Sequence, residues 1–181
     1  MPHPSSPGRR PQIPATRGAA HITGRALIVT TDGSLLLVQP SRLHGDYHFP
    51  GAAARNEEPP GDACDRAIFE NLNLHLTRRD QLLTAWAESP IPGARSEVTL
   101  LFDYGIYDSQ QIISHARLNR THIDDWALIS PSDALEALAP SQSELLQATI
   151  HGVRHLVQRR ETPDLNSPYP LPGRSCLSAR R

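Results

Sequence analysis

The sequence contains no lysine, only two cysteines and almost no excess of charge of either sign. All 18 basic residues are arginine and the formal net charge is −1, so the sequence predicts no broad basic surface for nucleic acid. Two cysteines cannot build a disulfide framework, which fits a reducing compartment, and we expect a cytoplasmic, bacterial protein. No apolar run reaches the roughly 18 residues that a membrane span requires, so we expect no membrane partner.

Proline is abundant instead, with 17 residues in a chain of 181, and it is concentrated towards the two ends. Residues 1–20 and 161–181 combine proline with arginine or serine and show no apolar periodicity. Such segments cannot bury enough apolar surface to offset the entropy of ordering them. We therefore predict one folded domain over residues 21–160, between two disordered tails.

The apolar pattern within that domain predicts both strands and helices. The residue pair Asp32-Gly33 separates two apolar runs and is typical of a β-hairpin. Cys64, Ile68 and Leu72 recur every four residues and indicate the buried face of a helix. The predicted strands are residues 26–31, 34–39, 47–49, 82–87, 98–107 and 125–129. The predicted helices are 61–72, a short one from 131 and a last one from 141, whose apolar face would be Leu146, Ile150, Val153 and Val157. This order predicts an α+β fold, with a sheet covered by helices on both faces.

The stretch from residue 49 to residue 74 resembles the Nudix box. That motif reads Gly, five residues, Glu, seven residues, then Arg-Glu-apolar-x-Glu-Glu-x-Gly-apolar. Five of its nine defined positions are matched, by Glu58, Arg66, Ile68, Glu70 and Leu74. The other four are replaced, by Ala52, Ala67, Asn71 and Asn73. The resemblance extends over about residues 22–160 and implies the Nudix fold, a mixed sheet between helices in an α/β/α sandwich.

The resemblance also implies a reaction and a metal. Nudix enzymes typically cleave a diphosphate linked to another group, and Mg²⁺ or Mn²⁺ neutralises the charge on the phosphoryl oxygens. The helix glutamates of the family supply much of the ligation. Positions 67, 70 and 71 lie within one face of a helix, which we expect to look into a cleft. Only Glu70 keeps a charge there, so the metal would be held weakly, by Glu70, by Asn71 through its amide oxygen, and by Glu58, which could instead stabilise the loop.

Three further residues have two interpretations each. Arg66 would orient Glu70, four residues away on the same helix, or would form an ordinary surface ion pair. His122 stands near the position at which many relatives carry a glutamate base, but an exposed turn histidine is the better explanation of it. Cys64 lies on the apolar face and is better explained as a small buried residue than as a nucleophile.

Two main functions follow from the resemblance. The first is a divergent hydrolase that acts on a nucleoside diphosphate derivative or a similar small-molecule diphosphate, with Glu70, Arg66 and His122 as catalytic candidates. The second is a catalytically impaired, ligand-binding or regulatory protein of the same fold; a different reaction at the same place is a third. Homodimers are frequent in the family, so the resemblance makes a homodimer one possible state, but the sequence does not decide the oligomeric state. The residues 40–46 and 88–96, where substrate selectivity is expected, carry no readable motif.

Overall fold

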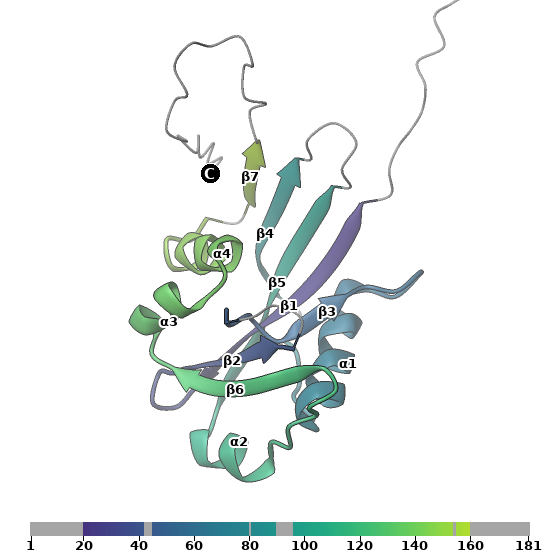
Figure 1. Cartoon of the computed structure of the whole chain (residues 1–181). Coiled ribbons are helices and arrows are strands. Elements are labelled where there is room, and N and C mark those ends of the chain that lie inside the picture. The colour runs from purple at the N-terminus through teal and green to yellow at the C-terminus, as the bar shows by residue number, and fades with distance from the viewer. Residues whose placement is uncertain (1–19, 42–44, 80, 90–95, 154, 160–181) are drawn as a thin grey trace, which may run out of the picture.

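The computed structural model describes residues 20–41, 45–79, 81–89, 96–153 and 155–159 of the chain. Within these residues, seven strands form one mixed sheet in the order β6-β2-β1-β5-β4-β7, with β3 also paired to β1 (Figure 1). The strands are β1 (His21–Thr30), β2 (Leu35–Pro40), β3 (Gly51–Ala53), β4 (Leu82–Ser89), β5 (Glu97–Tyr107), β6 (Ile123–Ile129) and β7 (His155–Arg159). Strand β1 is parallel to β5 and β4 is parallel to β7, whereas the other pairs are antiparallel.

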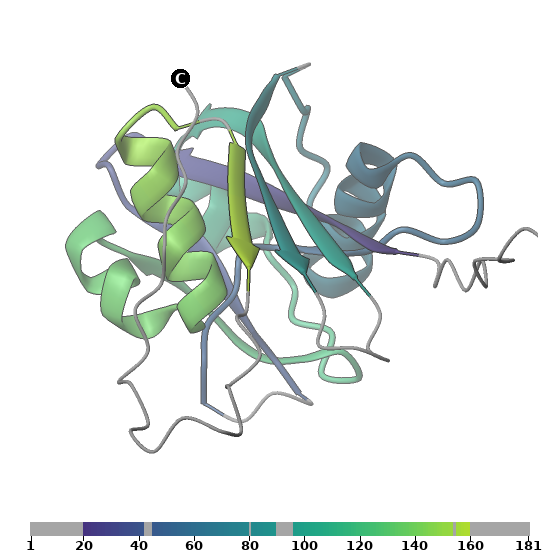
Figure 2. The same ribbon diagram turned by 90° about the horizontal axis from the view of Figure 1, so that it is seen from above.

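Helices cover both faces of this sheet. They are α1 (Pro60–Leu72), α2 (Ser109–His115), α3 (Pro131–Ala137) and α4 (Pro140–Ile150). Helix α1 lies on one face, and α3 and α4 lie on the other (Figures 1 and 2). The predicted α+β class and the mixed sheet between helices are confirmed. Among the described residues, no helix is both long and apolar enough to cross a membrane.

Strand β1 joins the two halves of the core, because its side chains alternate between the two faces. Ala26 and Ile28 belong to the apolar cluster under α1, together with Cys64, Ile68 and Leu72 of that helix. Leu27 and Val29 pack instead against the cluster under α3 and α4. The helix face predicted from the spacing of Cys64, Ile68 and Leu72 is therefore confirmed, and all three are 1% exposed or less.

Helix α1 begins where a proline is well tolerated and ends at a residue that leaves the helical conformation. Pro60 occupies the first turn, where no intrahelical N–H bond is lost. Asn73 has φ 54° and its N–H donates to the carbonyl of Phe69, which closes the helix. The predicted helix of residues 61–72 is confirmed to within one residue.

The C-terminal part of the predicted fold is partly wrong. The last helix begins at Pro140, its N-cap residue Ala139 makes no side-chain capping bond, and it ends at Ile150, which is exposed. The segment after it forms β7 beside β4, because parallel pairing with β4 satisfies its backbone groups. Helix α2 was not predicted from the sequence; its start is capped by the Asp108 side chain, which accepts from the N–H of Gln111. The predicted tails, except for Ala20, lie outside the described residues.

A buried polar contact attaches α4 to the segment before β3. The Phe49 N–H donates to Gln142 Oε1 at 2.7 Å, so the amide nitrogen of Gln142 faces His48 Nδ1 at 2.5 Å. His48 Nδ1 must then act as the acceptor, and the neutral ring carries its proton on Nε2. Burial, and secondarily the charge of Arg25, lowers the pKa of His48 from 6.5 to about 4.

We expect this contact to make the protein less stable in mild acid. The pKa of His48 is lower in the folded protein, so its contribution to stability is complete above pH 6.5 and is lost as the pH falls towards 4. Thermal melting between pH 7 and pH 4 measures the loss. His48→Asn keeps an acceptor but cannot titrate, so its melting temperature should fall less steeply over this range. Equal slopes for the two proteins would contradict the assignment.

Candidate functional site

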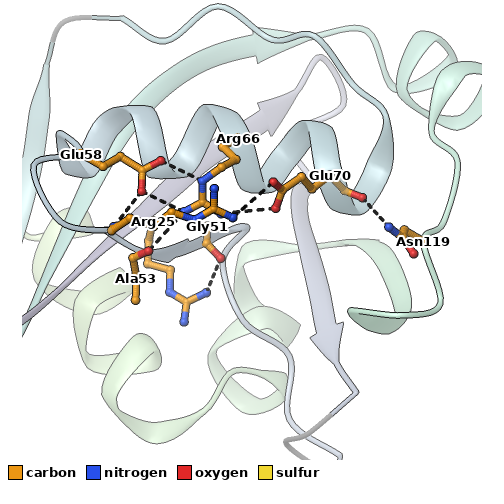
Figure 3. Close-up of polar contacts among 8 residues, drawn as sticks. Arg25, Gly51, Ala53, Glu58, Arg66, Glu70 and Asn119 are labelled. Carbon is orange, nitrogen blue, oxygen red and sulfur yellow. Dashed lines mark hydrogen bonds and ion pairs between the residues drawn. The ribbon is translucent and has the colours of Figure 1, made fainter.

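Three of the residues that match the Nudix box, Glu58, Arg66 and Glu70, are brought together along α1 and the loop before it (Figure 3). Arg66 donates through Nε to Glu58 Oε1 at 2.8 Å and through a terminal nitrogen to Glu58 Oε2 at 3.0 Å. The same nitrogen reaches the carbonyl of Ala53 on β3 at 3.3 Å. This two-point pair fixes the loop of residues 54–59 against the helix and against β3.

Glu70 is the next residue in the same network. Its Oε2 accepts from the remaining terminal nitrogen of Arg66 at 3.3 Å, and its Oε1 lies 3.7 Å from a guanidinium nitrogen of Arg55. The Glu70 side chain is 38% exposed, compared with 17% for Glu58. Arg66 thus holds Glu70 in place while leaving part of its carboxylate open to solvent, as expected for an orienting arginine.

Glu58 is more completely engaged than Glu70. Its Oε2 also accepts from the backbone N–H of Arg55 at 2.8 Å. The hydrogen bonds from Arg66, followed by that from the Arg55 N–H, lower the pKa of Glu58 to about 2. Both carboxylate oxygens therefore have donors, and of the two roles expected for Glu58 the geometry favours loop stabilisation over metal binding.

Ala67 does not lie where the sequence placed it. It was expected to look into a cleft beside Glu70, but it is only 2% exposed and packs on the buried side of α1. The helix face that was expected to look into the cleft is narrower than predicted and does not include position 67. The reason is that α1 covers both β1 and β3, so its buried surface extends round to Ala67. Asn71 is half-buried. On this face of the helix, Glu70 is the residue that combines charge with exposure.

A segment far along the chain fixes the end of α1. Asn119 donates through Nδ2 to the Glu70 carbonyl at 2.9 Å, and its N–H donates to the Asn71 carbonyl at 2.9 Å. These bonds satisfy two of the carbonyls that the last turn of a helix leaves free. Asn119 has no local signal in the sequence, so this positioning residue was missed.

His122 follows in the turn before β6 and is exposed. Its backbone carbonyl accepts from the Ser41 N–H. Within the described part of the chain, its side chain makes no hydrogen bond to Arg66 or Glu70. The proposed role of His122 as a base therefore has no geometric support from the described contacts.

The donor set suits a metal only in part. No group of three His, Cys, Asp or Glu side chains among the described residues is arranged to hold an ion. Glu70 supplies one carboxylate and Asn71 supplies a neutral amide oxygen. Mg²⁺, however, is commonly bound through one or two carboxylates together with substrate phosphates and water. These residues therefore suit a metal that arrives with a phosphate-bearing ligand better than a resident ion.

Replacing Ala67 with glutamate tests how deeply this position is buried. We expect Ala67→Glu to destabilise the fold without metal by about 3 kcal/mol or more, because the new carboxylate would be buried without a partner. Asn71→Glu is the matched control; it adds the same group at a half-buried position and should cost about 1 kcal/mol or less. Urea unfolding measures both. An Ala67→Glu protein as stable as the parent would show that this side chain can reach solvent.

Comparison with known proteins identifies the fold through structure. The sequence matches no family model and no curated protein. Among solved structures, the MutT protein from Methanosarcina mazei Go1 is similar, with TM-score 0.62, 16% identity and coverage of 75% of this chain and 96% of that one. A MutT NUDIX hydrolase from Burkholderia pseudomallei has TM-score 0.55 and 20% identity, and the match covers 75% of this chain and 98% of that one. A C. elegans Ap4A hydrolase has TM-score 0.54 and 15% identity, and the match covers 71% of this chain and 96% of that one. The shared architecture shows that this protein has the Nudix fold.

Proposed function

We propose that the protein is a divergent Nudix-type hydrolase that cleaves a diphosphate linkage in a small molecule such as a nucleoside diphosphate derivative. The observation that carries the proposal is the Glu58–Arg66–Glu70 network, in which a retained arginine orients one partly exposed carboxylate. The proteins of similar structure that are named hydrolases support the same reaction class.

Glu70, with Asn71 beside it, would contact Mg²⁺ or Mn²⁺ that is shared with the ligand. When bound, such a metal neutralises the charge that develops on phosphoryl oxygens. The chain itself contributes orientation, since Arg66 and Asn119 hold the side chain and the backbone of Glu70. Arg55 is 67% exposed and lies beside Glu70, where its charge would attract a phosphate.

A second candidate is a ligand-binding protein of this fold that no longer hydrolyses its ligand. The observation in its favour is Ala67, which has no ligand atom and is buried. In that case the same surface would bind a diphosphate without converting it. The small-molecule ligand and the cytoplasmic location belong to the proposal in either form, as does a homodimer.

Calorimetric titration separates the two candidates. We expect Mn²⁺ alone to bind weakly, and to bind about tenfold or more tightly once a non-hydrolysable nucleoside diphosphate analogue is present, because the phosphates complete the coordination. Glu70→Gln should remove this coupling. Binding of the analogue with equal affinity with and without metal would favour the second candidate.

A further inference from the structure

Arg25 of β1 is a charged residue in an unusual position. The side chains of Ala26 and Ile28 lie on the face of the sheet that α1 covers. Because neighbouring side chains of a strand point to opposite faces, the Arg25 side chain lies on the other face. One terminal nitrogen donates to the carbonyls of Phe49 at 3.0 Å and Gly51 at 3.2 Å. Its Nε is buried and has no hydrogen-bond partner. In Figure 3 the Arg25 guanidinium points away from α1 and from Arg66.

Among the described residues, no carboxylate forms an ion pair with this guanidinium. The ion pairs among the described residues involve Arg55, Arg66, Arg78 and Arg79, but not Arg25. Glu97 is near enough for its charge to act on Arg25, yet it is exposed and forms no ion pair with it. Burial lowers the pKa of Arg25. Arg25 as a whole is half-buried, and a charge partly withdrawn from water without a counter-ion is costly and is usually compensated by an anion.

A second buried donor without a partner lies on the same face. Trp86 is 4% exposed and its Nε1 makes no hydrogen bond. Strand register places Arg25 opposite Leu101, and Trp86 opposite Thr99, in neighbouring rows of the sheet. Both Trp86 and Leu101 belong to the cluster under α3 and α4. Strand β5 lies between β1 and β4, and Arg25 donates in the other direction, to the carbonyl of Gly51 on β3, so the two side chains would meet different parts of a bound ligand. Both contribute only donors, so a group beside either one must offer acceptors.

We propose that Arg25 binds an anionic oxygen group of the ligand, either a carboxylate or a phosphate ester. A guanidinium is a planar fork that fits both kinds of group. This inference extends the proposed function, because it assigns the ligand a second anionic group besides its diphosphate.

Strand β3 connects this second site to Glu70. The Gly51 carbonyl accepts from Arg25 and the Ala53 carbonyl accepts from Arg66. Two residues along a strand are separated by about 7 Å, so one elongated small molecule could span both sites. The two arginines are therefore anchored to the same short strand from opposite sides.

Anion titration of the metal-free full-length protein tests the proposal. Inorganic phosphate and acetate are titrated separately by calorimetry against the parent, Arg25→Met and Arg120→Met, an exposed control. We expect one or both anions to bind the parent and Arg120→Met equally, and Arg25→Met about tenfold or more weakly. The anion that binds more tightly identifies the class of group. Unchanged binding by Arg25→Met, or no binding of either anion to the parent, would overturn the proposal.

Arg25→Lys covers the case in which Arg25→Met fails to fold. Lysine keeps the charge but not the planar fork, so this variant should fold and bind the preferred anion several-fold more weakly than the parent. Parent-like affinity in Arg25→Lys would again overturn the proposal. Diphosphate hydrolysis is measured in parallel. Anion binding at Arg25 without hydrolysis would contradict only the proposed function. Hydrolysis without anion binding would contradict only the inference about Arg25.

Discussion

Glu70→Gln is expected to lower diphosphate hydrolysis in Mg²⁺ by about 100-fold or more, because even outer partners of a metal site contribute about 10–100-fold. Glutamine has the same shape and can still accept a hydrogen bond from Arg66, but it carries no charge for the metal. Among the described residues, Glu70 is the partly exposed acid that the network of Glu58 and Arg66 orients, so a neighbouring acid cannot easily replace it. Initial rates with excess Mg²⁺ measure the effect.

The control for this variant is Glu136→Gln, which removes an exposed acid from α3 and should leave the rate unchanged. The melting temperature of Glu70→Gln should also stay close to that of the parent, since a partly exposed ion pair contributes about 1 kcal/mol or less. A parent-like rate in Glu70→Gln would mean that catalysis does not depend on this helix.

Gly24→Ala is expected to destabilise the fold by about 3 kcal/mol or more, through overpacking at a position that cannot relax. A Cβ at Gly24 would lie 1.9 Å from the Pro60 carbonyl oxygen and 2.8 Å from Cys64 Sγ. The first of these is backbone at the start of α1, so relief requires the helix to move away from β1. Movement of α1 would also displace Arg66 and Glu70, and hydrolysis should fall together with stability.

Gly33→Ala provides the comparison, because the same methyl group there has open space. Gly33 has φ +84° and nothing lies within 4 Å of the position that a Cβ would take, so the cost is backbone strain alone, about 1 kcal/mol. Urea unfolding of the two variants gives the difference. Equal losses of stability would show that α1 is not held tightly against β1.

Local patterns account for most of the fold but not for its C-terminal end. The spacing of Cys64, Ile68 and Leu72 predicted α1 because a helix face depends on neighbouring residues alone. Val153 and Val157 fit the same spacing, which predicts that they belong to the last helix, yet β7 begins at His155. Its pairing with β4 joins segments far apart in the chain, and short apolar runs do not distinguish strand from helix.

The site was predictable to a similar extent. Arg66 and Glu70 are four residues apart on one helix, so their pairing follows from sequence. The two-point pair between Glu58 and Arg66 depends on the turn at Glu57, which has φ 63°, and no local pattern predicts it. The environment of Arg25 arises from pairing between β1 and β3, so a lone arginine in an apolar strand gave no sign of it.

The most direct test of the proposed function is ³¹P NMR of the purified protein with Mg²⁺ and a set of nucleoside diphosphate derivatives. The hydrolase proposal predicts that diphosphate resonances of at least one compound disappear while phosphomonoester resonances grow. It also predicts that this conversion is abolished by chelating the metal and strongly reduced in Glu70→Gln. Compounds that bind the protein but keep their diphosphate resonances unchanged would contradict the proposal and leave ligand binding as the function of this fold.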